Sequence, residues 1–571
     1  MPKISNKKVT HLFFYTFIIW LVITFIIYPI SVVFTNSLLV GGNLDFSSIE
    51  KVLTSKRAMQ SIKNSFVLAV SLAVSVNFLG VFLVLVTDYF EISGARFLKM
   101  GYMTTLLMGG IVMNFGYLLV YGKNGFLTKL LMEVLPNLDP YWFEGFGAVF
   151  FVMTFGTTHI YMLFLSSAIR SVDFNLIEAA KLMGSSPSYI LKTVVLPTLK
   201  PVIITLTIMT FQTGLAAFSA PVMVGGKTFQ TISPLILTFA NRPASRDLAS
   251  ILSIFLGFTQ IFLLYSMTRN EHRLRYLSLS KTQARLQKQK IQSSIWNAVI
   301  HVLAYLILII YSLPLVALII ASFSKSQALR SANLSFSQLT LDNYVKVFSL
   351  SDNLQPIVTS IFYSLIAALA AVFLMAIVAR KVHRGQLKFF TPLLEYVFYI
   401  PWLIPGLLLV VGYLMAYDRP SFLLGGHSVI GSWWILPITY MVVSLPNSLR
   451  YLKAAYYGLD NQLEDASVLL GASSGYTFRK IVLPVILPTI LALIAIHFNR
   501  LVDDFDLSVF LYQPSQPTLG IVIRRNANAD TNSDAQAINA VYSVFLMGIK
   551  GLALYFIYGR GNRLAEERRG K

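Results

Sequence analysis

Two stretches of the sequence repeat each other at an offset of 287 residues. Residues 173–201 read DFNLIEAAKLMGSSPSYILKTVVLPTLKP, and residues 460–488 read DNQLEDASVLLGASSGYTFRKIVLPVILP. They align without a gap, and the matched pairs are Asp173 with Asp460, Leu176 with Leu463, Ala179 with Ala466, Leu182 with Leu469, Gly184 with Gly471, Ser186 with Ser473, Tyr189 with Tyr476, Lys192 with Arg479, and Leu196-Pro197 with Leu483-Pro484. A match at one fixed offset indicates an internal repeat. We therefore expect two related halves.

The first copy has the pattern of two short helices. Residues 176–183 lack Gly and Pro and are rich in residues that favour helices. Gly184 can end that helix because it takes a left-handed conformation without steric cost. Ser186 followed by Pro187 matches the N-cap and first position of a second helix, and Pro197 then opens the next apolar segment. We expect two short helices at an angle along the membrane surface.

Such an element can present one face to a soluble partner, as a helix fills a groove. Glu178 and Ala179 are expected on that face, where a small residue allows close approach and a carboxylate accepts a directed hydrogen bond. The alternative is a well-capped loop in which Glu178 forms an exposed local salt bridge of little worth. The second copy, at a matched position in the other half, favours the docking interpretation.

The composition places the chain in a lipid bilayer. Of its 571 residues 56% are hydrophobic and only 12% are charged, unlike a soluble protein of this size. A spanning helix needs about 20 apolar residues, and such windows cover 12–40, 64–87, 101–122, 145–169, 201–226, 248–268, 302–324, 354–379, 396–417, 428–449, 481–499 and 536–559. We predict an all-α membrane protein with about twelve transmembrane helices as two parallel six-helix repeats, the first window being a retained span.

Six predicted spans separate the two copies, and this even number puts both copies on the same side of the membrane. The expected division is a first half at 1–268, a basic cytoplasmic linker at 269–292 and a second half at 293–571. The linker is interpreted as a solvated segment, with a basic helix on anionic lipid as the alternative.

The net charge of +21 is interpreted as membrane orientation rather than nucleic-acid binding, because the basic residues flank the spans. Both termini and both copies of the repeat are expected in the cytoplasm. The residues behind this expectation are Lys3, Lys7, Lys8, Arg380, Lys381, Arg384, Arg560, Arg563, Arg568, Arg569 and Lys571, with Lys51, Lys56, Arg57 and Lys63 as an exception.

The repeated segment resembles the cytoplasmic loop of membrane permease subunits of binding-protein-dependent ABC importers. That loop reads Glu-Ala-Ala, three residues, Gly, nine residues and Ile-x-Leu-Pro. The first copy matches at Glu178, Ala179, Ala180, Gly184, Leu196 and Pro197, with Val194 in place of Ile. The second copy matches at Ala466, Gly471, Ile481, Leu483 and Pro484, with Asp465 and Ser467 where Glu and Ala are usual.

The resemblance implies a type I importer in the fused branch, in which one chain supplies both halves of the pathway in a bacterial cytoplasmic membrane. The loops would form coupling helices seated in a separate cytoplasmic ATPase dimer of identical subunits, and an extracytoplasmic binding protein would deliver the solute. The chain itself would be no enzyme, with no cofactor and no metal site. Weaker similarity at 511–514 and 221–226 points to permeases for ferric iron and, less so, for thiamine or phosphonates.

Three carboxylates are candidates for the solute pathway: Asp503, Asp504 and Asp506. Ionisable residues beside a span are functional candidates, and these would favour a cationic solute such as a metal ion, thiamine or a polyamine. The alternative is that Arg500 pairs with Asp503 or Asp504 at helical spacing.

A secondary active transporter is the competing function, because parallel halves occur there too. It leaves the paired loops unexplained. A membrane enzyme is disfavoured, since the sequence offers no nucleophile or metal-ligand spacing.

Overall fold

The computed structural model describes residues 6–40, 43–170, 172–274, 287–331, 336–384, 390–459, 461–527 and 533–569. It is almost entirely helical, with one two-residue antiparallel pair, β1 (Leu39–Val40) with β2 (Asn43–Leu44). The helices before the linker are α1 (Asn6–Val22), α2 (Tyr28–Leu38), α3 (Ser47–Thr54), α4 (Lys56–Val84), α5 (Ala95–Tyr102), α6 (Gly110–Tyr121), α7 (Phe126–Val134), α8 (Phe146–Ile169), α9 (Phe174–Leu182), α10 (Pro187–Ile190), α11 (Leu196–Leu215), α12 (Ser219–Val224), α13 (Ile232–Ala240) and α14 (Arg246–Leu274). Those after it are α15 (Ser294–Ser322), α16 (Ser326–Ser331), α17 (Asp342–Ser349), α18 (Ser351–His383), α19 (Phe390–Leu403), α20 (Gly406–Ala416), α21 (Ile435–Tyr457), α22 (Asn461–Leu469), α23 (Ser474–Thr477), α24 (Leu483–Leu501), α25 (Ser508–Leu511), α26 (Leu519–Asn526) and α27 (Ser533–Arg569).

Nine helices in the described part of the chain are long and apolar enough to cross a membrane, and two bent pairs raise the number to eleven. The chain is thus an all-α protein with the helices of a multi-pass membrane protein, but the expected number of about twelve is not confirmed. The helix outside this set is α21, in which Pro446, Asn447 and Arg450 interrupt the apolar sequence.

Several predicted spans are broken rather than continuous. The window 101–122 bends by 110° before α6, and the window 396–417 bends by 101° between α19 and α20. The window 201–226 ends as a helix at Leu215, and a short helix, α12, follows. Unwound backbone at membrane depth must find hydrogen-bond partners in protein or in a wet cavity, and these breaks all adjoin one cavity.

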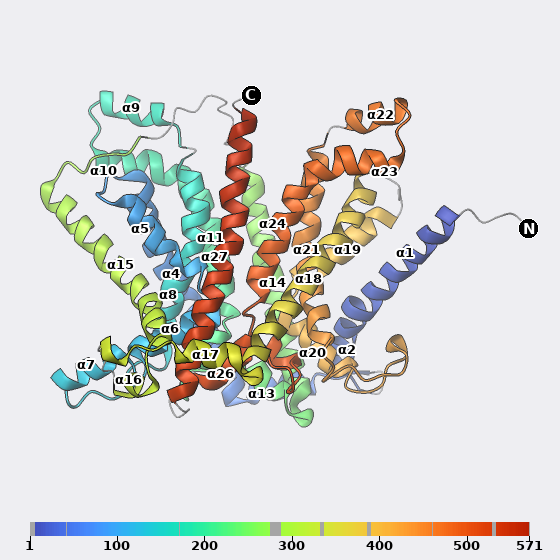
Figure 1. The fold of residues 1–571 in the computed structure, drawn as a ribbon, viewed down its shortest axis with the longest axis horizontal. Coiled ribbons are helices and arrows are strands. Elements are labelled where there is room, and N and C mark those ends of the chain that lie inside the picture. The colour runs from blue at the N-terminus through green and yellow to red at the C-terminus, as the bar shows by residue number, and fades with distance from the viewer. Residues whose placement is uncertain are drawn as a thin grey trace, which may run out of the picture.

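Residues 6–274 and 287–569 exchange their first helices. The helices α1 and α2 pack against the second of these parts, and α15 packs against the first. Figure 1 shows α15 beside α5 on one side of the molecule and α1 and α2 beside α18 and α20 on the other. The Tyr102 hydroxyl on α5 donates to the Ala304 carbonyl on α15 at 2.8 Å, and Tyr413 on α20 donates to the Phe25 carbonyl at 2.7 Å. These exchanges tie the two parts into one packed body.

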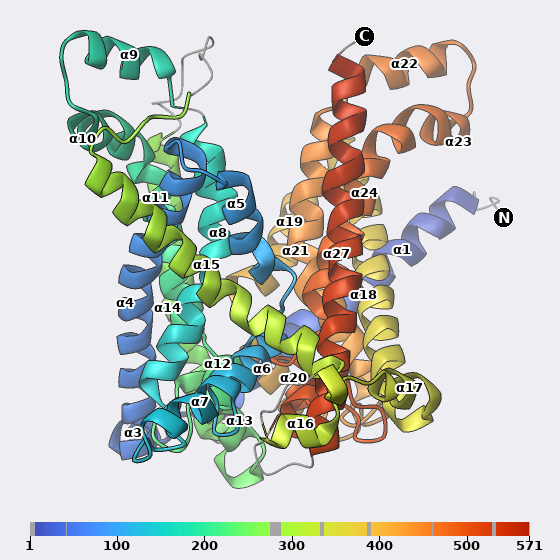
Figure 2. The same ribbon diagram turned by 60° about the vertical axis from the view of Figure 1, so that its left-hand side comes forward.

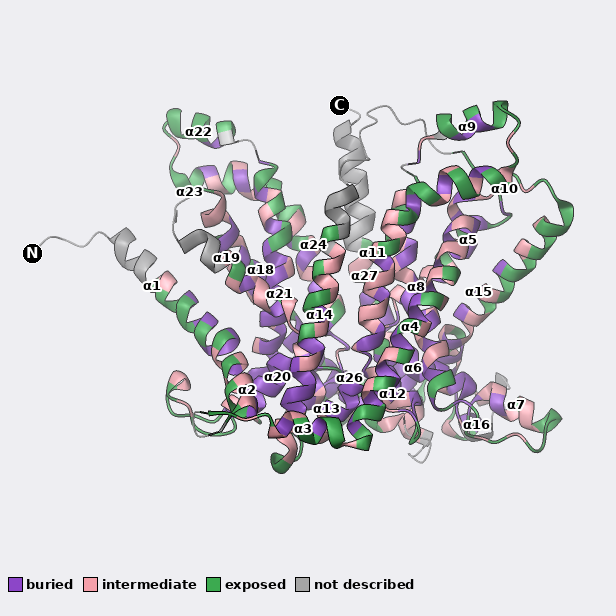
Figure 3. Ribbon diagram, turned by 180° about the vertical axis from the view of Figure 1, so that it is seen from behind, coloured by how far each residue is buried: buried purple, intermediate pink, exposed green. Residues whose placement is uncertain are grey.

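Burial is uneven along the long axis of the spans. Figure 3 shows buried residues gathered around α20, α26 and α6, and exposed ones over α9, α22 and the outer face of α15. The buried end therefore closes the bundle, while α9 and α22 stand apart at the other end in both Figures 1 and 2.

The end of the predicted linker is bound to the protein rather than solvated. Gln289 N–H donates to the Tyr89 carbonyl at 2.8 Å, and Glu91 N–H donates back to Gln289 at 2.9 Å. The Lys288 ammonium donates to the Thr87 carbonyl at 2.9 Å, and burial there lowers the pKa of Lys288. Backbone pairing satisfies polar groups that the sequence-based prediction left to water. Residues 275–286 lie outside the described residues.

Replacing Gly412 by Ala is expected to destabilise the contact between α2 and α20. A Cβ atom at this glycine would lie 2.7 Å from the Pro29 carbonyl oxygen, which is overpacking worth about 1–3 kcal/mol. The matched control is Gly548→Ala on α27, where a Cβ atom would meet nothing within 4 Å. Thermal unfolding in detergent, followed by intrinsic fluorescence, should show a lower midpoint for Gly412→Ala alone. Equal midpoints would contradict the close packing.

Candidate functional site

The loop at 173–201 has the predicted capping. The Asp173 carboxylate accepts from the Asn175 N–H at 3.0 Å and begins α9. At its end Gly184 is left-handed, with φ of 78°. Ser185 N–H then donates to the Ala180 carbonyl at 3.0 Å, and Gly184 N–H donates to Lys181 at 2.9 Å. This is the double hydrogen bond by which a left-handed glycine ends a helix, so the predicted helix end is confirmed.

The second helix of this loop differs from the expectation. Ser186 caps it, accepting from Tyr189 N–H at 3.4 Å, and Pro187 begins it as predicted. It does not end before Pro197, however. It continues through a π-helical turn at 191–195 into α11, which begins at Leu196. The π turn accommodates Pro197, which has no N–H to donate, so the loop is continuous with the apolar helix behind it.

The loop at 460–488 has the same local structure. Its elements α22, α23, the π turn at 478–482 and α24 begin and end at the same offset of 287 residues from α9, α10, the π turn at 191–195 and the start of α11. Gly471 has φ of 82°, and Ser473 accepts from Tyr476 N–H at 3.3 Å. The shared pair Leu483-Pro484 opens α24 as Leu196-Pro197 opens α11.

Both loops expose the residues that the sequence singled out. Glu178, Ala179, Asp465 and Ala466 are exposed, whereas Ala180 is buried against the core. Within the described residues, neither Glu178 nor Asp465 has an ion pair within 4 Å. The local salt bridge considered for Glu178 is thus not formed.

Each loop also exposes large apolar side chains at corresponding positions. Leu182 is 89% exposed and Leu469 is 87% exposed. The full set is Leu176, Leu182, Met183 and Tyr189 in one loop and Leu463, Leu469, Leu470 and Tyr476 in the other. Contiguous exposed apolar surface marks an interaction site, so each loop has the character of a docking surface.

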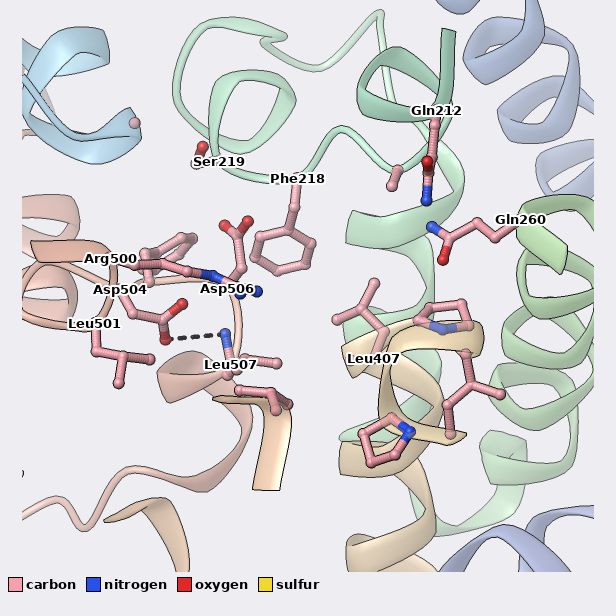
Figure 4. A pocket seen from close by; sticks show the side chains of 18 of the residues that line it. Gln212, Phe218, Ser219, Gln260, Leu407, Arg500, Leu501, Asp504, Asp506 and Leu507 are labelled. Carbon is pink, nitrogen blue, oxygen red and sulfur yellow. Dashed lines mark hydrogen bonds between the residues drawn. The ribbon is translucent and has the colours of Figure 1, made fainter. Parts of the chain in front are cut away.

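A cavity of about 470 Å³ lies between the two parts of the molecule. Its walls come from α11, α14, the break between α19 and α20, α21, α24 and the segment 502–507. The bent backbone around Pro401 and Pro405 lines it. In Figure 4, Arg500 and Asp506 lie close together on one wall, and Gln212 and Gln260 lie on the opposite wall.

The three candidate carboxylates have different environments. Asp503 is buried, and its carboxylate is 2.6 Å from the ammonium of Lys550 on α27, which is 5% exposed. Asp504 accepts from the Tyr440 hydroxyl at 3.0 Å and from the N–H groups of Leu507 and Ser508 at 3.2 and 3.0 Å. Asp506 is exposed to the cavity. Only Asp506 therefore offers a carboxylate that is not already held by the protein.

The alternative considered for the acidic cluster, a pairing of Arg500 with Asp503 or Asp504, is not formed. Lys550 takes Asp503, because α27 packs against α24 and brings this lysine to the end of that helix. Arg500 instead is exposed to the cavity, without an ion pair within 4 Å in the described chain. No group of three or more His, Cys, Asp or Glu among the described residues is placed to hold a metal ion. The cavity thus exposes one carboxylate, that of Asp506, and one guanidinium, that of Arg500.

Three carboxamides in the cavity wall were missed from the sequence: Gln212, Gln260 and Asn447. Each interrupts a largely apolar helix, and a polar residue within a span is itself a signal of a cavity. The sequence analysis selected the three aspartates instead, because charged residues differ more than carboxamides from the apolar residues of a span.

Replacing Lys550 by Met is expected to destabilise the protein by about 3 kcal/mol, because it leaves Asp503 as an unpaired buried charge. The double variant Asp503→Asn plus Lys550→Met buries no charge and should recover most of that loss. The midpoint of thermal unfolding measures both. If the single variant is as stable as wild type, the ion pair is not a buried one.

The sequence matches the family model described as binding-protein-dependent transport system inner membrane component over residues 374–571. A probable ABC transporter permease of Sinorhizobium fredii, y4fN, is 33% identical over 548 residues, covering 95% of each chain. A putative ferric transport system permease of Haemophilus influenzae, FbpB 1, is 25% identical over 507 residues, covering 86% of this chain and 77% of that one. A putative 2-aminoethylphosphonate transport system permease of Salmonella typhi, PhnV, is 23% identical over 242 residues, covering 42% and 87%.

The similarity to y4fN extends over nearly the whole of both chains, and it agrees with the resemblance carried by the two loops. The secondary-transporter and membrane-enzyme alternatives are therefore not retained. ATP hydrolysis resides on a separate subunit, and the chain works in the bacterial inner membrane with that ATPase and a binding protein. The chain belongs to the family of membrane permease subunits of binding-protein-dependent ABC importers.

Proposed function

We propose that the two loops, 173–201 and 460–488, bind a cytoplasmic ATPase dimer of identical subunits and transmit its movement to the cavity. The observation that carries this proposal is the pair of matched apolar surfaces at one end of the molecule, each beside an exposed carboxylate, Glu178 or Asp465. Two equivalent surfaces suit two equivalent subunits, because a two-fold partner presents the same site twice. Each loop continues into a spanning helix, which gives movement a direct route to the cavity.

The division into two related six-helix halves, 1–268 and 293–571, is part of the same proposal. It is supported by equivalent contacts: Ser65 accepts from the Ile232 N–H at 2.9 Å, and Ser360 accepts from the Leu519 N–H at 2.7 Å. Phe218 and Phe505, related by the offset of 287 residues, meet with ring centroids 5.6 Å apart. Contact between corresponding residues is what a two-fold axis between the halves requires.

The orientation proposed puts the loops and both termini in the cytoplasm. The loops expose Lys181, Lys192, Arg479 and Lys480, as the positive-inside rule favours. In Figures 1 and 2 α27 ends beside the loops, and α1 begins nearer to them than α2 does. The basic residues around α3, at the opposite end, remain the exception.

Ferric iron is the first candidate solute, because the relatives that align over most of this chain include ferric transport permeases. Asp506 would face a cation in the cavity, and Asp504 lies beside it. The absence of a metal-ligating cluster among the described residues suits passage rather than storage, since conduction requires that binding be weak enough for release.

A second candidate solute is 2-aminoethylphosphonate, which the name of PhnV supplies. The observation favouring it is Arg500, whose guanidinium shares the cavity with Asp506. A guanidinium suits a phosphonate and a carboxylate suits an ammonium group, so this cavity matches a solute with both charges.

The proposed mechanism is alternating access. A loaded binding protein docks at the extracytoplasmic end, ATP closes the ATPase dimer, and the loops carry that closure to the two halves. Each half moves as a near-rigid body, so the cavity opens to one side at a time.

Reversing both loop charges, Glu178→Lys plus Asp465→Lys, is expected to release the ATPase and to lower ATP-dependent uptake at least about tenfold, because like charges at an interface cost several kcal/mol. The measurement is copurification of the ATPase, followed by uptake in proteoliposomes. The control is Glu133→Lys plus Asp352→Lys, the same charge change at exposed positions outside the loops, which should keep the ATPase bound. Retention of the ATPase by the loop variant would contradict the proposed docking.

The two solutes are separated by Asp506→Asn and Arg500→Gln, each tested in uptake of ferric iron and of 2-aminoethylphosphonate. If iron is the solute, Asp506→Asn should slow its uptake and Arg500→Gln should not. If the phosphonate is the solute, both variants should slow its uptake, since each removes one charge partner. Unchanged uptake in both variants would exclude Asp506 from the pathway.

A further inference from the structure

The interiors of the two loops are built from different chemistry. In the loop at 460–488, Ser467 and Thr477 are buried, and their hydroxyls form a 2.9 Å hydrogen bond that joins α22 to α23. The corresponding residues of the other loop are Ala180 and Ile190, which are buried and apolar. The departure of Ser467 from the family's Ala thus has a structural partner.

A second polar contact fixes α22 to the membrane helix α18. Glu464, only 3% exposed, faces inward from α22 and forms ion pairs with Arg380, at 3.6 Å, and with Arg384. The Arg380 guanidinium also lies over the Phe478 ring, 4.5 Å from its centroid. One carboxylate and two guanidiniums therefore connect the end of α18 with α22 and with the turn that follows α23.

The loop at 173–201 has apolar residues at these positions. Ile177, fully buried, corresponds to Glu464, and Leu191 corresponds to Phe478 at the same offset of 287 residues. The equivalent hydrogen bonds of Ser65 and Ser360 relate α4 to α18, and that relation puts Leu85 in the place of Arg380.

At the corresponding end of α4, the carboxylate that forms ion pairs is Asp88, which does not belong to the loop. Asp88, which follows α4, pairs with Lys99 at 2.6 Å and with Arg170 at 3.1 Å. Arg170 lies at the end of α8, before α9 begins. This cluster joins α8 to α4 and includes no residue of α9. Among the residues that the structure describes, therefore, α22 has an ion pair to a membrane helix and α9 has none.

We infer that Glu464 is a positioning residue: through Arg380 and Arg384 it fixes α22 to α18, so that the second loop and its membrane helix move together. A shift of α22 would leave buried charge without a partner, which is strongly unfavourable, whereas an apolar contact such as that of Ile177 tolerates sliding. The two loops therefore transmit force unequally. The inference rests on the proposed docking of the ATPase for its functional consequence, but not for the attachment itself.

The test uses the permease–ATPase complex and a pair of spin labels on each half. Val468→Cys with Ile377→Cys reports on α22 relative to α18. The matched control pair is Lys181→Cys with Phe82→Cys, at the corresponding positions of α9 and α4. The chain has no cysteine of its own, so each pair is labelled alone. The width of the distance distribution measures how firmly α22 is fixed to α18 and how firmly α9 is fixed to α4.

Glu464→Gln is expected to broaden the 468–377 distribution and to leave the 181–82 distribution unchanged. ATP hydrolysis by the complex should fall about threefold or more while the ATPase stays bound, a range typical of mutations that alter coupling between sites. Glu464→Ile plus Arg380→Leu rebuilds the apolar set of the other loop. Its 468–377 distribution should be broader than that of wild type, because an apolar contact tolerates sliding, but narrower than that of Glu464→Gln, because Arg380 is no longer left without a partner. Arg384→Gln, which changes only the more exposed guanidinium, should give an intermediate width even if Glu464→Gln fails to fold.

Unchanged widths in Glu464→Gln and in Arg384→Gln would overturn the inference, and so would a double variant whose distribution is as broad as that of Glu464→Gln. If the wild-type permease binds no ATPase, the proposed function fails instead. The distance distributions of the permease alone would then still decide whether Glu464 holds α22.

Discussion

Backbone hydrogen bonding inside a bilayer is the constraint on which this structure depends. Helices satisfy their own polar groups, and unwound backbone at membrane depth is tolerated only against protein or a wet cavity. The bends before α6 and between α19 and α20, and the unwound segments after α11 and α24, all border the same cavity. The cavity therefore lies where the helices stop.

The two loops, 173–201 and 460–488, have similar backbones but different side chains. The loops agree in capping, in left-handed glycines and in π turns, because those features follow from a backbone geometry that both loops share. Their interiors differ: α22 is contacted through two ion pairs and a hydrogen bond, and α9 through apolar residues. The cavity differs in the same way at Ser219 and Asp506, which both line it and lie 287 residues apart.

The sequence predicted the helical membrane class, the capping of the first loop and the exposed positions of Glu178 and Ala179, since these depend on local chemistry and on composition. It did not predict that Lys550 rather than Arg500 pairs with Asp503. That pairing depends on how α27 packs against α24, which spacing along one helix cannot reveal. The buried role of Glu464 was missed for the same reason: its partners lie on a helix some eighty residues earlier in the chain. Broken spans were read as continuous because hydropathy averages over a break.

The proposed coupling requires that the two loops move relative to each other when the ATPase binds nucleotide. Because the chain has no cysteine, spin labels at Ser188→Cys and Gly475→Cys, exposed and equivalent positions beside the docking helices, report the separation directly in the reconstituted complex. If the loops follow the closure of the ATPase, the distance shortens when a non-hydrolysable ATP analogue is added and returns when nucleotide is removed. A distance that stays the same with the ATPase bound and nucleotide present would contradict the proposed coupling.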